Sequence, residues 1–90
     1  MMTETAPKHD LSRRQLAVLE KVDGAEIATP NLIEQVRRHR AFRGVAADSL
    51  RILVHRALDH LVAAGFVADR YAPGQTRPVR HVSRRQQPSR

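Results

Sequence analysis

Residues 54–67 read VHRALDHLVAAGFV, and no other run in the chain carries as much structural information. Val54, Leu58 and Leu61 recur at the spacing of an α-helix and predict a helix with one apolar face. Gly65 stands where such a helix would end, because glycine adopts the left-handed conformation of a helix cap without steric cost. Phenylalanine and valine follow at once and favour an extended chain. The run therefore predicts a helix that leads directly into a strand.

A β-hairpin is predicted after this helix. The first strand is expected from Phe66 to Tyr71 and the second from Pro78 to Ser83, because both are short runs bounded by turn residues. Pro73-Gly74-Gln75 lies between them as the tip of the hairpin. Because proline cannot donate a hydrogen bond to a neighbouring strand, the second strand is expected to begin at its proline or to lie on a free edge.

Two further helices are predicted nearer the N-terminus. The first begins near Ser12, which has the spacing of a capping box with Gln15, and ends near Gly24. The second spans about residues 30–42, because Thr29 is a good capping residue and a proline at the first helical position loses no needed hydrogen bond. Both helices carry apolar residues at helical spacing on one side.

The chain is thus expected to be mainly α-helical with a small β-hairpin. A short extended piece is expected at 25–28 and a break at Arg43-Gly44-Val45, with the third helix spanning 47–64. Ninety residues suffice for one small core. The expected organisation is a disordered arm at 1–10, one domain at 11–83 and a basic disordered tail at 84–90.

Positive charge dominates the composition. Sixteen Lys and Arg residues against nine Asp and Glu give a net charge of +7. The excess is concentrated in two acid-free segments, one between Glu34 and Asp48 and one after Asp69. A short chain this basic favours a polyanionic partner, most often nucleic acid.

Other compositional features exclude several classes of protein. There is no cysteine, so the chain forms no disulfide and no thiolate metal site, as is typical of cytosolic proteins. No apolar run approaches the roughly 20 residues of a membrane span, and the N-terminus lacks the order of a signal peptide. We therefore expect a cytoplasmic, nucleoid-associated protein with no membrane partner.

Three helices followed by a hairpin resemble a winged helix-turn-helix domain. VHRALDHL at 54–61 with AGFV at 64–67 is similar to the recognition helix and first wing strand of MarR-type and PadR-type transcriptional regulators. Leu11-Ser12, Gln15-Leu16 and Val18-Leu19 resemble the first helix of many such domains. The resemblance implies a small transcriptional regulator that binds double-stranded DNA sequence-specifically, as a homodimer with a paired site.

The same resemblance assigns roles to side chains. The outer side of the helix at 47–64 would enter the major groove, and the Arg-rich wing would contact the backbone or a minor groove. Arg56 and Asp59 are expected to form an ion pair on that side. The residues expected to read bases are Ser49, Arg51, Ile52, His55 and Arg56. Those expected to contact the backbone, from the second helix and the wing, are Arg37, Arg38, Arg40, Arg43, Arg70, Gln75, Thr76, Arg77 and Arg80.

Alternatives remain open. The same fold would serve a plasmid or phage replication or partition protein, an architectural DNA-binding protein, or an adaptor that binds another protein. The basic helix faces and hairpin also have a simpler interpretation as ordinary solvated surface. RNA binding is disfavoured, because no aromatic stacking motif is visible.

No enzyme, cofactor, metal site or small-molecule substrate is expected. His55 and Asp59 lie one turn apart and would suit a metal, but no third ligand follows at a useful spacing. Ser49 shares their side of the helix, yet a solvated helix face provides no oxyanion pocket. Phe42 and Tyr71 are expected to pack within the fold.

Overall fold

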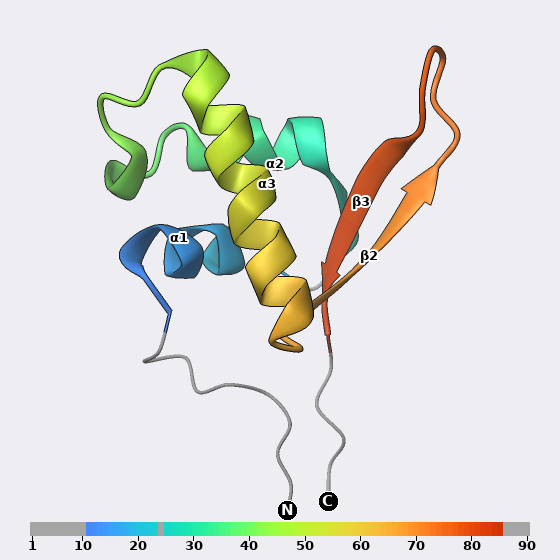
Figure 1. Cartoon of the computed structure of the whole chain (residues 1–90), viewed down its shortest axis with the longest axis horizontal. Coiled ribbons are helices and arrows are strands. Elements are labelled where there is room, and N and C mark those ends of the chain that lie inside the picture. The colour runs from blue at the N-terminus through green and yellow to red at the C-terminus, as the bar shows by residue number, and fades with distance from the viewer. Residues whose placement is uncertain (1–10, 24, 86–90) are drawn as a thin grey trace, which may run out of the picture.

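The computed structural model describes residues 11–23 and 25–85. Within them lie three α-helices, a short 3-10 helix and three strands (Figure 1). The arm expected at 1–10 and residues 86–90 of the expected tail lie outside the described residues. In chain order the elements are α1 (Arg13–Lys21), β1 (Ile27–Ala28), α2 (Thr29–Val36), η2 (Arg40–Phe42), α3 (Ala47–Ala63), β2 (Val67–Ala72) and β3 (Val79–Arg84).

The first helix begins as the sequence predicts. The Ser12 hydroxyl accepts a hydrogen bond from the Gln15 backbone N–H at 3.1 Å, and the Gln15 side chain accepts one from the Ser12 N–H at 2.9 Å. This reciprocal capping box satisfies two N–H groups that a helix start leaves without partners. The helix ends at Lys21, three residues before the expected glycine. Gly24 itself lies outside the described residues.

The second helix differs from the prediction at both ends. Thr29 is its first residue and makes no cap, because its hydroxyl donates a buried hydrogen bond to the carbonyl of Arg80 at 2.7 Å. The helix ends at Val36 and does not continue to Phe42. The chain instead turns through an extended His39, whose Nδ1 accepts from the Ala41 N–H at 3.0 Å and starts η2. A local side-chain cap thus begins a separate turn where the predicted helix would have continued.

The end of α3 confirms the prediction for Gly65. This glycine has a positive φ of 88°, and its N–H donates to the carbonyl of Val62 at 3.1 Å. The N–H of Phe66 donates to the carbonyl of Leu61 at 2.9 Å. This is the double hydrogen bond of a glycine-capped helix end, and it turns the chain straight into β2.

The hairpin belongs to a larger sheet than expected. β2 and β3 pair antiparallel from Val67 opposite Arg84 to Ala72 opposite Val79. The extended piece before α2 adds a third strand, because β1 pairs antiparallel with β3 through Ile27 opposite Val82. The order across the sheet is β1-β3-β2, so the last of these strands in the chain is the central one.

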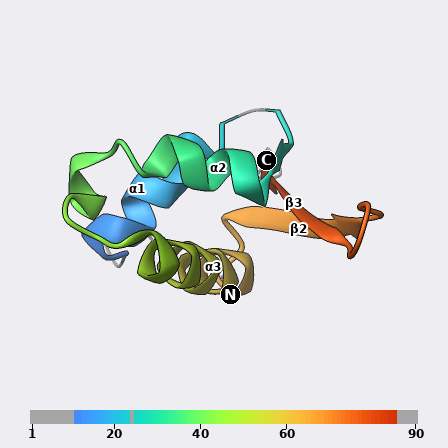
Figure 2. The same cartoon turned by 90° about the horizontal axis from the view of Figure 1, so that it is seen from above.

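The core lies between the three helices and one face of the sheet. Figure 2 shows α2 and α3 on opposite sides, with α1 across one end and the hairpin projecting from the other. The predicted inner face of α3 is confirmed, because its apolar residues are buried. The sheet contributes Val67 and Val82, while the helices contribute Leu19, Leu32, Val36, Leu50, Val54, Leu58 and Leu61.

Candidate nucleic-acid interface

The outer side of α3 is exposed along its length. Ile52 lies at its centre and is 52 % exposed, which confirms that an apolar side chain stands where water is expected. Ser49 and Arg56 flank it on the side of α1, while Arg51 lies toward the other side. His55 is half-buried against the sheet. All five residues predicted to read bases therefore lie on the outer side of α3 or at its edges.

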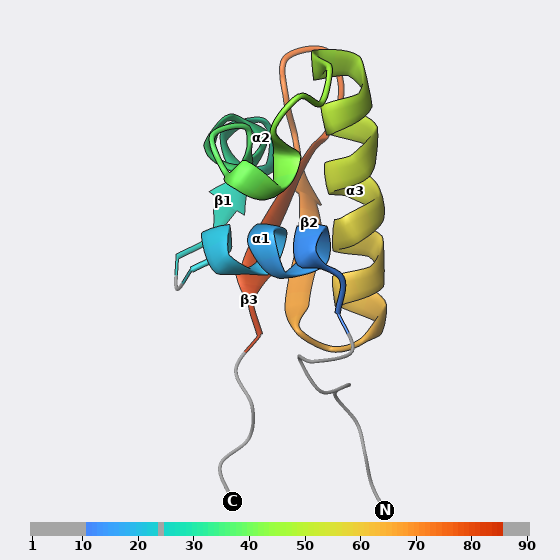
Figure 3. The ribbon, with the colours of Figure 1, turned by 90° about the vertical axis from the view of Figure 1, so that its left-hand side faces the viewer.

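The hairpin projects beside the first half of α3. Figures 1 and 3 show the hairpin tip and the start of α3 at the same end of the molecule. Gln75, Thr76 and Arg77 are exposed at this tip. Tyr71 precedes the tip and is 63 % exposed, so the expectation that it packs within the fold is wrong. Its strand extends beyond the helices there, which leaves nothing to cover the ring.

Arg80 is not available to an outside partner. We expected Arg80 to be accessible on a strand of the wing. In the structure it is only 7 % exposed, and its side chain faces α3. Its Nε donates to Asp69 Oδ2 at 2.9 Å and its Nη1 to His55 Nδ1 at 3.3 Å, while its Nη2 forms an ion pair with Asp59 Oδ1 at 3.0 Å. Asp59 therefore pairs with Arg80 and not with Arg56, contrary to the expected pair on α3. We call Arg80, Asp69, Asp59 and His55 the Arg80 cluster.

Arg70 lies on the opposite face of the sheet and is already paired. Its Nε and Nη2 both donate to the carboxylate of Glu26, each at 2.7 Å. The hydrogen bond from Arg70 lowers the pKa of Glu26 and the same bond raises the pKa of Arg70. His81 lies between them on β3, with its Nδ1 at 3.9 Å from Glu26 Oε1. Arg70 therefore stays exposed, but its charge is largely compensated.

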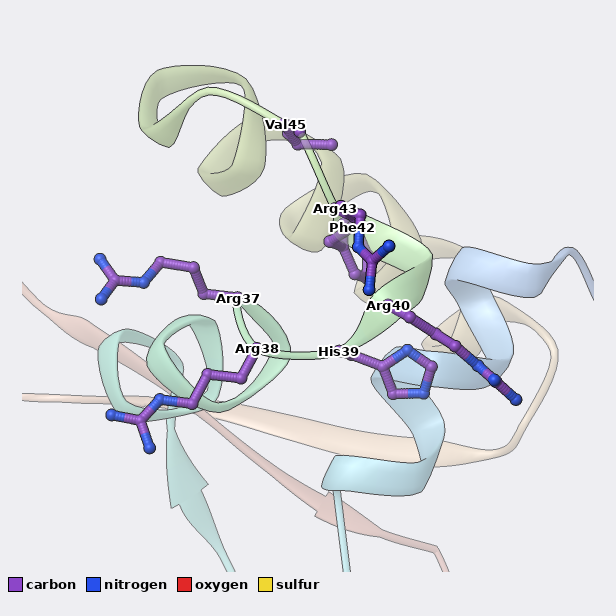
Figure 4. Close-up of a pocket in the computed structure, with 8 residues that line it drawn as sticks. Arg37, Arg38, His39, Arg40, Phe42, Arg43 and Val45 are labelled. Carbon is purple, nitrogen blue, oxygen red and sulfur yellow. The ribbon is translucent and has the colours of Figure 1, made fainter.

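The arginines after α2 line an open hollow of about 310 Å³. Arg37, Arg38, Arg40 and Arg43 surround it together with His39, Phe42 and Val45 (Figure 4). The close-up shows Arg37 and Arg38 extending to one side of the turn and Arg40 to the other, so their guanidinium groups do not converge on one point. Arg37 also lies 3.7 Å from Glu34. This is a basic surface suited to several phosphates more than to one small anion.

Two arginines that sequence reasoning placed elsewhere, or did not single out, hold the fold together. Arg84 was expected in the disordered tail, but it ends β3, and its guanidinium donates to the carbonyls of Val22 and Leu19 at 2.9 Å each. It thereby caps the last turn of α1. Arg14 lies 5.6 Å above the buried ring of Phe42 and donates to the carbonyl of Ala41 at 3.1 Å. Neither role leaves a local signal in the sequence, because both partners lie far away in the chain.

The described residues contain no group of three or more His, Asp or Glu side chains placed to hold a metal ion. Nor does any helix in that part of the chain have the length and apolarity needed to cross a membrane. Comparison of the chain with protein-family models, with curated proteins and with solved structures finds no match.

Proposed function

We propose that the protein binds double-stranded DNA as a winged helix, with α3 in the major groove and the β2–β3 hairpin as the wing. The observation that carries the proposal is the joint presentation of the outer side of α3 and the hairpin tip at one end of the molecule (Figures 1 and 3). An α-helix with its side chains is about 10–12 Å wide, and the major groove is about 12 Å wide, so the helix fits.

The connectivity supports this proposal. The elements follow in the order α1, β1, α2, α3, β2, β3, and the sheet order is β1-β3-β2. That arrangement agrees with the winged helix that the sequence motifs resemble. It brings a helix and a two-stranded ribbon side by side, and both kinds of element are used to contact grooves in DNA.

Unpaired positive charge supports it as well. Within the described residues, six of the arginines near α3, the hairpin tip and the hollow make no ion pair with an acid. Each phosphate neutralised lowers the slope of log K against log salt by roughly 0.9, so full use of six would give a slope of about −5. These six are Arg38, Arg40, Arg43, Arg51, Arg56 and Arg77.

The side chains divide between two tasks in this proposal. Arg56 and Ile52 on the outer side of α3, with His55 at its edge beside the sheet, would meet the base edges. The arginines of the hollow and Arg77 at the tip would contact phosphates on either side of the groove. A single helix and wing cover half a site, so we further propose a homodimer on a two-fold symmetric sequence.

The test is selection of bound duplexes from a random pool. The affinity of the protein for the most enriched duplex is then measured at several salt concentrations. We expect a defined, symmetric sequence and a steep salt dependence. Arg77→Ala should reduce the salt slope by about one, while Arg56→Ala should weaken the selected duplex by roughly 5- to 150-fold and random duplex far less. Arg85→Ala is the matched control, because Arg85 lies at the base of the same hairpin, where its N–H donates to the carbonyl of Phe66.

A protein-binding adaptor is the second candidate. It is favoured by two exposed apolar side chains, Ile52 and Tyr71, because protein interfaces are enriched in aromatic anchors. Absence of salt-sensitive binding to any duplex would replace the DNA proposal with this one. Selection of repeated, origin-like sites in place of a single operator would instead point to a replication or partition protein.

A further inference from the structure

His55 lies where α3 meets the sheet, in contact with Arg80 of β3. Its Nδ1 is 3.3 Å from Arg80 Nη1, and the Arg80 guanidinium is in turn held by the carboxylates of Asp69 and Asp59. The four side chains come from α3, β2 and β3. The position of the guanidinium, and with it the donor that faces the imidazole, is therefore fixed from three elements.

This contact determines which nitrogen of His55 carries the proton. A guanidinium is always charged and has only N–H donors, so Nδ1 must accept the hydrogen bond from Arg80. The proton of the neutral imidazole is then on Nε2. In a doubly protonated imidazole, the N–H at Nδ1 would point at the N–H of Arg80, and no hydrogen bond could form between them. In agreement, burial and the neighbouring charge of Arg80 lower the pKa of His55, while Asp59 raises it by a smaller amount and Arg51 lowers it slightly.

The second nitrogen of His55, Nε2, is not fully buried and has no hydrogen-bond partner among the described residues. No buried side-chain nitrogen or oxygen in that part of the chain lacks a partner, so Nε2 must be at least partly accessible. The ring leaves α3 one turn after Ile52, on the side where the wing stands. A donor of fixed orientation is thus presented in the angle between α3 and the hairpin.

We propose that Arg80 holds His55 as the Nε2–H tautomer so that His55 donates a hydrogen bond to N7 of a purine in the major groove. The proposal rests on the DNA binding proposed above and adds the chemical group that is read. The acceptors in the major groove are N7 of both purines, O6 of guanine and O4 of thymine, and N7 is the one that guanine and adenine share, whereas the exocyclic amino groups of cytosine and adenine only donate. Arg80 is the positioning residue, and His55 determines specificity.

The tautomer is tested first, in the free protein at neutral pH. Two-dimensional NMR that correlates the imidazole nitrogens with the ring protons distinguishes a protonated from an unprotonated nitrogen. We expect His55 to show protonated Nε2 and unprotonated Nδ1, while His60, which is exposed on α3, shows an averaged mixture. A proton on Nδ1, or on both nitrogens, would overturn the proposal without any substitution in the protein.

The contact to DNA is tested next, on the duplex enriched from the random pool. Each purine is replaced in turn by its 7-deaza analogue, which lacks the N7 acceptor and keeps base pairing. One replacement should weaken wild-type binding by about 3- to 10-fold, as expected for one hydrogen bond, and should leave His55→Ala unaffected. His60→Ala serves as the control and should retain the wild-type loss at that position.

The outcomes separate this inference from the proposed function. If the duplex binds and no 7-deaza position distinguishes wild type from His55→Ala, the reading by His55 is wrong and DNA binding stands. If no duplex binds at all, both proposals fall, whereas the NMR result still reports whether Arg80 fixes the tautomer.

Discussion

Arg80 forms two ion pairs, one with Asp69 and one with Asp59, that are nearly equal in length but differ in how far water reaches the carboxylate. Arg80 lies 2.9 Å from Asp69 and 3.0 Å from Asp59, but the Asp69 side chain is 24 % exposed and that of Asp59 is 69 % exposed. Water screens the second pair far more than the first. If burial sets the strength of these contacts, then removing Asp69 must destabilise the fold more than removing Asp59.

The expected magnitudes follow from that difference. Asp59→Asn should cost less than about 0.5 kcal/mol, as is usual for exposed pairs. Asp69→Asn should cost about 1.5–2.5 kcal/mol, below the roughly 3–5 kcal/mol seen when a fully buried pair is broken. Arg80→Met keeps the aliphatic stem but leaves Asp69 half-buried and unpaired, and should cost about 3 kcal/mol. For a domain of this size that corresponds to a Tm lowered by roughly 12–24 °C.

The assay is urea unfolding followed by circular dichroism, with double-mutant cycles for Arg80–Asp69 and Arg80–Asp59. The coupling energy of the first pair should exceed that of the second by at least about 1 kcal/mol. Equal couplings, or a larger one for Asp59, would refute the reasoning from burial. An Arg80→Met protein as stable as wild type would show that the cluster does not hold the wing to α3.

Three further outcomes are expected. Arg84→Ala removes the cap on the carbonyls of Leu19 and Val22 and should lower the unfolding free energy by about 1–2 kcal/mol, measured against Arg85→Ala. Gly74→Ala brings a methyl group against the Arg77 carbonyl, so it should weaken DNA binding by distorting the hairpin tip while the unfolding midpoint changes little. Because the folded state lowers the pKa of His55 below its ordinary value of 6.5, the contribution of His55 to stability should be constant above that pH and decrease as the pH falls below it toward the folded-state pKa. The unfolding free energy of His55→Gln should lack this decrease when it is measured against pH. If wild type and His55→Gln show the same dependence on pH, His55 is not its source.

Local patterns in the sequence predict the elements well. The spacing of Ser12 and Gln15, the apolar stripe of α3 and the glycine at its end each act within a few residues, and all three are present in the structure. The premature end of α2 has a local cause too. A histidine that caps the next turn is a weak signal beside three arginines that favour a continuing helix, which explains the prediction of a helix as far as Phe42.

The site was harder to predict because its arginines look alike in the sequence. Arg70, Arg77 and Arg80 all lie in the acid-free hairpin region, yet one is paired on the outer face, one is free of acids at the tip and one is buried. Their roles depend on pairing register and on acids far away in the chain, such as Glu26 and Asp59. Nothing within a window of a few residues distinguishes them.

The strand order has a consequence for how the chain reaches this structure. β3 lies between β1 and β2 but follows both in the chain. Until Val79–Arg84 is in place, neither earlier strand has a neighbour, Thr29 lacks its carbonyl acceptor and α1 lacks its Arg84 cap. The β2–β3 pairing is local, whereas the β1–β3 pairing joins Ile27 to Val82 across most of the chain, so we expect the β1 edge of the sheet to close last. Until β3 has paired with both neighbours, an open strand edge is exposed to other chains, and we expect the protein to be most prone to aggregation in that interval.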